Sequence, residues 1–191
     1  TSTTRFNVKL NTAGLNLKSL LSLVPAVYKK DFEKVEASGD VKMDAFIKGD
    51  MKNDEIPSFD IDLHVIDGKF KYSQLPGAVS DINVNARLFN PGGPADSIQL
   101  YIPTLNLIMG GNPVIASLRL ITPYTDPDFA VKMKGKIDLE KIERVYPLEK
   151  SIIIKGLVSA DAEVAGKMSY FDNKQFDKFS AKGVISAKNC V

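Results

Sequence analysis

Hydrophobic residues alternate with polar or charged residues along most of this chain. The alternation is clearest in segments 6–10, 41–47, 59–65, 82–88, 129–133 and 158–164. Such a period of two places apolar side chains on one face of a strand and polar ones on the other, as in antiparallel sheets with one solvated face. Weaker runs at 69–72, 98–102, 105–109, 115–121, 151–155 and 179–187 follow the same pattern. The sequence therefore predicts a mainly β protein with about a dozen strands.

Residues that favour turns lie between these runs. They are Asp67-Gly68, the segment 90–94, the segment 110–113 and Asp126-Pro127-Asp128. Glycine, proline, asparagine and aspartate are the residues that tight turns prefer. Most connections are thus expected to be short, which favours a single large antiparallel sheet.

Two segments have the spacing of a helix instead. The apolar positions are Leu17, Leu20, Leu21 and Val24 in the first segment, and Leu139, Ile142 and Val145 in the second. Asn16 and Asp138 precede them as N-cap residues. Pro25 should end the first helix, with a second short turn over 26–32, and the second helix should stop before Pro147. Both helices are amphipathic and too short to cover a large sheet.

The two helical segments lie in regions that resemble each other. Phe6-Asn-Val-Lys-Leu10 precedes the first helix and Phe129-Ala-Val-Lys-Met133 precedes the second, at an offset of 123 (129 − 6). The match resumes between 39–51 and 156–168 at an offset of 117 (156 − 39). We interpret this as a repeat of roughly 120 residues that starts at about 6 and again at about 129, within one fragment spanning 1–191. Chance similarity between short alternating strands is the alternative.

The apolar face of so large a sheet needs a cover. A dozen strands about 4.8 Å apart would span roughly 50–60 Å. Soluble monomers rarely expose apolar patches beyond a few hundred Å². The sheet must therefore close on itself, as in a sandwich or barrel, or cover something apolar that is not in this sequence.

Composition excludes several classes of function. The net charge of +2 reflects 25 basic and 23 acidic residues, without the basic excess of a nucleic-acid-binding surface. The chain has one cysteine, Cys190, and one histidine, His64. A disulfide within the chain is impossible, and a zinc site made of cysteine and histidine lacks ligands. No apolar run is long enough to span a membrane as a helix. No cofactor or metal is expected.

Catalytic motifs are equally scarce. Asp60, Asp62 and His64 share the polar face of one predicted strand, but successive same-face residues lie nearly 7 Å apart, and no second cluster completes a site. A solvated strand face is the favoured interpretation. Gly92-Gly93 and Gly110-Gly111 are not followed by a helical pattern, so hairpin turns explain them better than phosphate binding does. The protein is expected to be non-enzymatic, and an enzyme with carboxylates at Asp60 and Asp62 ranks lowest.

Several stretches resemble the C-terminal region of AsmA-family proteins. They are Leu15–Pro25, Gly39–Gly49, Phe70–Tyr72 with Leu75-Pro76, Ile82–Leu88, Asn90–Gly92, Thr122-Pro123, Asp126-Pro127 and Gly135–Ile142. The resemblance extends from Phe6 to about Val184. Its motifs are alternating strands punctuated by glycine and proline, and the family's N-terminal membrane anchor is not in this piece.

The resemblance implies a fold and a function. It implies a large curved antiparallel sheet, a β-groove, with two short amphipathic helices. It also implies a periplasmic protein tethered to the inner membrane by a segment outside this fragment. The family is linked to outer-membrane biogenesis and to phospholipid transport between membranes, with acyl chains carried on the apolar inner face. No catalytic residues are carried over, and protein partners are not specified.

Two main hypotheses follow. In the first, an open groove binds lipid acyl chains, and the helices plug or cap it. Its lining would be the inward alternates: Phe6, Val8, Leu10, Val41, Met43, Ala45, Ile47, Phe59, Ile61, Leu63, Val65, Ile82, Val84, Ala86, Phe129, Val131, Met133, Val158, Ala160 and Val164. In the second, a closed β-sandwich serves as a scaffold without lipid, the same residues form a dry core, and the helices belong to that core.

Overall fold

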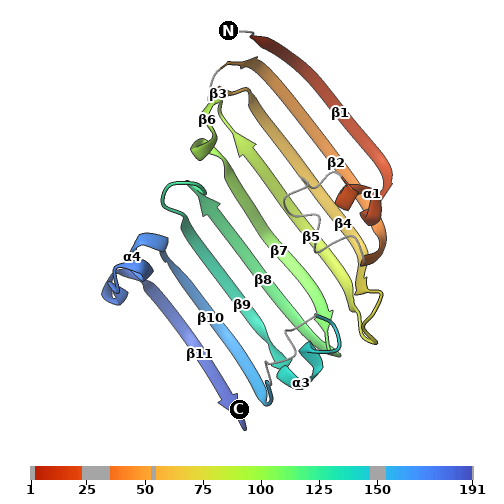
Figure 1. Cartoon of the computed structure of the whole chain (residues 1–191), viewed down its shortest axis with the longest axis vertical. Helices are drawn as coiled ribbons and strands as arrows, with labels where there is room; N and C mark the ends of the chain where they lie inside the picture. Colours follow the sequence, from red (N-terminus) through yellow and green to blue (C-terminus); the bar gives the residue numbers. More distant parts are fainter. Residues whose placement is uncertain (1–2, 23–34, 53–54, 147–153, 191) are drawn as a thin grey trace.

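The computed structural model describes residues 3–22, 35–52, 55–146 and 154–190. Nine of its strands form one antiparallel sheet in the order β1-β2-β4-β5-β7-β8-β9-β10-β11, so each strand pairs with the next of these along the chain (Figure 1). The prediction of a mainly β protein with a large antiparallel sheet is confirmed. In the described part, β1 and β11 each pair with one neighbour only, so this sheet is open at both edges.

The strands are long. The nine are β1 (Thr4–Asn16), β2 (Val35–Met51), β4 (Ser58–Tyr72), β5 (Val79–Asn90), β7 (Gln99–Met109), β8 (Asn112–Ile121), β9 (Asp128–Asp138), β10 (Leu157–Lys167) and β11 (Ser180–Lys188). A separate two-stranded pair joins β3 (Glu55–Ile56) to β6 (Gly93–Pro94). The expected count of about a dozen is close to the eleven strands of the described residues, although some runs counted separately belong to one strand. Segment 69–72 continues β4, and β7 contains residues 99–102 of one run together with the run 105–109. Of the run 151–155, residues 151–153 lie outside the described residues.

β-Bulges join these runs. Asp67-Gly68 was expected to form a turn, but it lies inside β4, where Asp67 has φ of 50° and the pairing register shifts. The register also shifts between Ile102 and Leu105 of β7, around Pro103. A bulge inserts an extra residue, bends the strand and increases its twist, and it tolerates a proline. The long strands accordingly bend along their length (Figure 1).

Gly110 and Gly111 form a hairpin turn, as expected. They connect β7 to β8 between the paired residues Met109 and Asn112, with φ of 57° and 81°. Positive φ at both central residues matches the twist of the flanking strands and favours glycine.

The two expected helices are present, and a third was not predicted. α1 (Leu17–Ser22) begins after Asn16, whose Oδ1 accepts a hydrogen bond from the Ser19 amide at 2.8 Å, as an N-cap does. The expected turn over 26–32 lies outside the described residues. α3 (Leu139–Ile142) follows β9, and its N-cap residue Asp138 makes no side-chain capping bond. α4 (Met168–Asp172) is the helix that the sequence pattern missed, and it is followed by a 3-10 turn, η2 (Phe176–Lys178). A second 3-10 turn, η1 (Ala95–Ser97), precedes β7.

The two regions proposed as repeats pair their strands in the same register. Phe6 of β1 lies opposite Gly49 of β2, and Phe129 of β9 lies opposite Gly166 of β10, the positions that the offsets equate. Further equivalent pairs are Val8–Ile47 with Val131–Val164, and Leu10–Ala45 with Met133–Ala162. A shared register is what a duplication would leave behind, and the duplication itself stays a prediction.

Candidate functional site

One face of the nine-stranded sheet, which we call the apolar face, carries all twenty residues predicted to line a groove. Residues directly opposite one another in an antiparallel pair point to the same side. One row of such pairs runs Leu10–Ala45–Ile61–Leu88–Leu100–Leu120–Phe129. Rows through the remaining predicted residues lie on the same side, and β7 and β8 add Ile102, Leu105, Leu107, Val114 and Leu118, which were not among the twenty.

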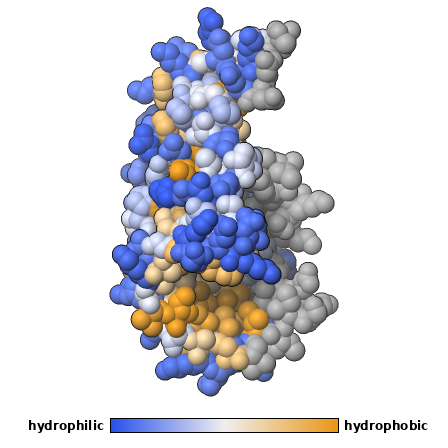
Figure 2. Space-filling view, turned by 90° about the vertical axis from the view of Figure 1, so that its left-hand side faces the viewer, coloured by the Kyte–Doolittle hydropathy of each residue, from blue (hydrophilic) through white to orange (hydrophobic). Residues whose placement is uncertain are grey.

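The apolar face is only partly covered. Of the twenty predicted residues, Val41, Ala45, Val65 and Ala160 are buried, while the other sixteen keep an intermediate or larger exposure. Val8 and Leu10 at the β1 edge are each 44% exposed. Figure 2 views the molecule from the β11 side, and hydrophobic surface is gathered in the lower part of this view. A dry sandwich core would bury these side chains almost completely.

Two helices cover the face at one end of the strands. Leu17 of α1 packs with Val41 and Val65 in the main buried cluster. Beyond α3, Val145 is 4% exposed, and the ring of Tyr146 meets Tyr72 edge-on at a centroid distance of 6.0 Å. These helices therefore cover part of the apolar face, which is the position that the groove hypothesis expected for a cap. They also contribute to a small core.

α4 and η2 form an aromatic corner at the opposite end of β9 and β10. A cavity of about 530 Å³ lies there, lined by Phe129, Val164, Met168, Phe171, Phe176 and Phe179. Phe129 and Val164 were predicted to line the groove, whereas the α4 and η2 residues were missed. The segment has no regular period, but four aromatic residues within 170–179 are a signal that could have marked it.

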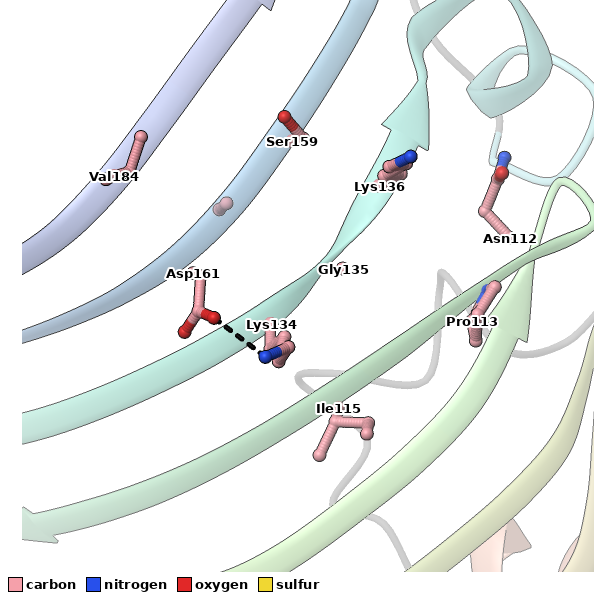
Figure 3. Close-up of a pocket in the computed structure, with 10 residues that line it drawn as sticks. Asn112, Pro113, Ile115, Lys134, Gly135, Lys136, Ser159, Asp161 and Val184 are labelled. Carbon is pink, nitrogen blue, oxygen red and sulfur yellow. Dashed lines mark ion pairs between the residues drawn. The ribbon is translucent and has the colours of Figure 1, made fainter.

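The opposite face of the sheet, the polar face, is crossed by ion pairs. Arg5 donates to Asp50 at 2.8 Å, and Lys134 lies 2.8 Å from Asp161. In Figure 3 the Lys134–Asp161 pair bridges β9 and β10, with Ile115 and Val184 on the flanking strands. Ile115 and Val184 line one pocket of about 640 Å³ on this face together with the ion pair. The pairs connect neighbouring strands across the sheet.

Two of the three residues considered as a catalytic cluster, Asp60 and His64, have side-chain partners on the neighbouring strand. Arg87 donates to both carboxylate oxygens of Asp60, at 2.7 and 2.6 Å. These hydrogen bonds lower the pKa of Asp60 below its ordinary value. His64 Nδ1 lies 2.7 Å from Oδ1 of Asn85 on the neighbouring strand. A carboxylate held by arginine favours its ionised form, which suits an ion pair better than a general acid.

Replacing Arg87 by alanine should return the pKa of Asp60 toward its ordinary range. A depressed carboxyl pKa stabilises the fold above the unfolded value of about 3.9, and that contribution is lost as the pH falls through the folded value. R87A should therefore show a smaller loss of stability on acidification. A carboxyl-carbon NMR titration measures the pKa. R5A, which removes a separate pair, should leave Asp60 unchanged, and an unshifted Asp60 in R87A would contradict the assignment.

Comparisons with protein-family models, with curated proteins and with solved structures find no match to this chain. Among the described residues, no group of three or more metal-binding side chains could hold a metal ion. Within the same described part, no helix has the length and hydrophobicity needed to cross a membrane. The apolar face is therefore the candidate site on its geometry alone.

Proposed function

We propose that this protein is a non-enzymatic β-groove module whose apolar face holds lipid acyl chains, in the service of phospholipid transport between membranes. The observation that carries the proposal is one continuous apolar face across nine strands with most of its predicted lining left partly exposed. The resemblance to AsmA-family proteins supplies the proposed setting, a periplasmic location and a role in outer-membrane biogenesis.

Physical chemistry favours an acyl chain as the occupant. Burial contributes about 0.8 kcal/mol for each CH₂ group removed from water, so a chain needs no polar recognition to bind usefully. The exposed parts of the face are aliphatic and aromatic, including Val8, Leu10 and Val131. The long bent strands offer an extended surface rather than a closed pocket, which suits a long flexible ligand.

A scaffold without lipid is the second candidate. Its specific support is that a protein partner could also cover an apolar face with two free edges, by pairing with β1 or β11. The closed sandwich that this hypothesis first assumed is not the architecture of the described residues, which place nine strands in one open sheet.

Native mass spectrometry separates the two candidates. The purified chain is incubated with phosphatidylethanolamine vesicles, separated from them and analysed intact. The groove predicts adducts with the mass of whole phospholipid, and the scaffold predicts the mass of the chain alone. Detection of the unmodified chain alone, without adducts across a range of vesicle compositions, would contradict the groove proposal.

A further inference from the structure

We propose that the aromatic corner is a separate seat for a single-chain anionic amphiphile, with a long-chain fatty acid carboxylate as the occupant. This proposal rests on the proposed function in one respect: two of the residues that line the corner, Phe129 and Val164, also belong to the apolar face. The corner itself is built by α4 and η2. In the region equated by the repeat, segment 52–57 connects β2 to β4, so the corner belongs to the second copy alone.

The corner is a built site and not a loose loop. Both carboxylate oxygens of Asp126 hold the start of α4, accepting hydrogen bonds from the Ser169 amide and hydroxyl at 2.9 Å each. The Met168 amide also donates to the Pro127 carbonyl at 2.8 Å. At the other end of the segment, the Gln175 amide donates to the Tyr170 carbonyl at 2.7 Å. The segment is thereby fixed over β9 and β10.

Gly166 leaves space for the ring of Phe179, which lies at the base of the aromatic corner. A Cβ atom at Gly166 would lie 2.4 Å from Cδ1 of Phe179, closer than such atoms can approach. The Phe179 ring also meets Phe129 at a centroid distance of 6.1 Å and Tyr170 edge-on at 6.0 Å. Glycine here lets the Phe179 ring lie directly on the strand, where Phe179 and Phe129 both line the cavity.

The cavity suits one apolar chain. Its volume of about 530 Å³ lies within the range of roughly 300–1,000 Å³ that small-molecule pockets occupy. All six lining residues are apolar. Phe171 and Phe176 form an edge-on pair at 6.1 Å, and each is 60% exposed. Two rings that meet edge-on and stay largely exposed beside an apolar cavity leave surface that a hydrocarbon chain would cover.

A cation beside the corner favours an anionic head group. The ammonium of Lys178 lies over the Tyr170 ring, 5.4 Å from its centroid, and Tyr170 in turn meets Phe179 of the cavity lining edge-on. No ion pair involving Lys178 occurs among the described residues. A cation held next to the lining residues is complementary to a carboxylate whose chain enters the cavity.

The same segment argues against insertion of the corner into a bilayer. Asp172, Asn173 and Lys174 form the turn between the two exposed phenylalanines, and all three are exposed. Burying such a turn in hydrocarbon would remove the charges of Asp172 and Lys174 from water, which is costly. Phe171 and Phe176 also line the cavity, so the rings and the cavity serve one ligand.

The chain lacks tryptophan, so a single introduced tryptophan reports on the corner without background. The F176W variant keeps an aromatic ring at the cavity mouth. F46W is the matched control, because Phe46 is a 44% exposed phenylalanine on the polar face. Dibromostearate, whose bromines quench tryptophan on contact, is titrated into each variant below its micelle concentration. We expect saturable quenching in F176W and little in F46W.

Second substitutions in the F176W background test the two halves of the seat. G166A displaces the Phe179 ring and should weaken dibromostearate binding at least several-fold. K178Q, a surface change with no effect expected on folding, should weaken it about two- to five-fold, the range of an exposed ion pair. It should leave the uncharged dibromostearyl alcohol unaffected. Equal effects of K178Q on acid and alcohol would overturn the head-group assignment.

Vesicles distinguish a fatty acid from a membrane. Quenching of F176W by vesicles of brominated phosphatidylcholine, with none by free dibromostearate, would overturn the proposal in favour of a membrane contact. The outcome for the groove is read separately by phospholipid adducts in the mass spectrum. Adducts without quenching of F176W leave the groove standing and remove the seat. Saturable quenching without phospholipid adducts supports the seat and removes the groove.

Discussion

A charged residue in the middle of the apolar face should abolish phospholipid uptake while leaving the fold intact. The variant is V131D. Val131 is 36% exposed and lies on β9, directly between Leu118 of β8 and Val164 of β10. Because the side chain already reaches solvent, a carboxylate here remains hydrated in the free protein. An acyl chain on the same rows would strip that hydration, at a cost of several kcal/mol.

The expected loss of uptake in V131D is ten-fold or more, since each 1.4 kcal/mol changes an affinity about ten-fold. Uptake is measured as the fraction of chains carrying phospholipid adducts, and stability by urea unfolding. I115D is the matched control, because Ile115 lies on the adjacent strand but on the polar face, where it is 51% exposed. Equal uptake by V131D and I115D would contradict the assignment of the binding face.

The side of the sheet on which each residue lies could be predicted well from the sequence. All twenty predicted residues lie on one face, because the period of a strand is two and antiparallel partners point the same way. A bulge would break this rule within a strand, but the sequence corrects for it. Beyond Asp67-Gly68 the hydrophobic alternation is shifted by one residue, from Val65 to Phe70, so that Phe70 still lies on the apolar face opposite Val79.

The division of the chain into individual strands, and the ends of those strands, could not be predicted in the same way. A glycine preceded by aspartate, or a proline such as Pro103, is a turn signal in isolation. Only pairing with both neighbouring strands keeps the chain extended through these positions, and pairing partners are not visible in a local pattern. The aromatic corner was missed for a related reason. Its rings come from a short helix and a 3-10 turn, and they meet only because α4 is held by Asp126.

The close approach of Gly39 in β2 to Gly68 in β4 should make substitution of Gly39 strongly destabilising. Gly39 of β2 has φ of 129°, and a Cβ atom there would lie 2.6 Å from Cα of Gly68 in β4. The clash is between backbones, so a rotamer change cannot relieve it. G39A should therefore lower the free energy of unfolding by about 3 kcal/mol or more, from a strained φ together with forced separation of two neighbouring strands.

G14A separates these two causes. Gly14 also has a positive φ, 86°, but a Cβ atom there would meet nothing within 4 Å. Its substitution should cost only the conformational strain, about 1–2 kcal/mol. Urea unfolding of both variants measures the difference directly. If G39A proves no less stable than G14A, the close approach of β2 and β4 at their facing bulges cannot be correct. These two bulges lie beside the small core of Leu17, Val41 and Val65. The bend of the strands at the bulges would then need another explanation.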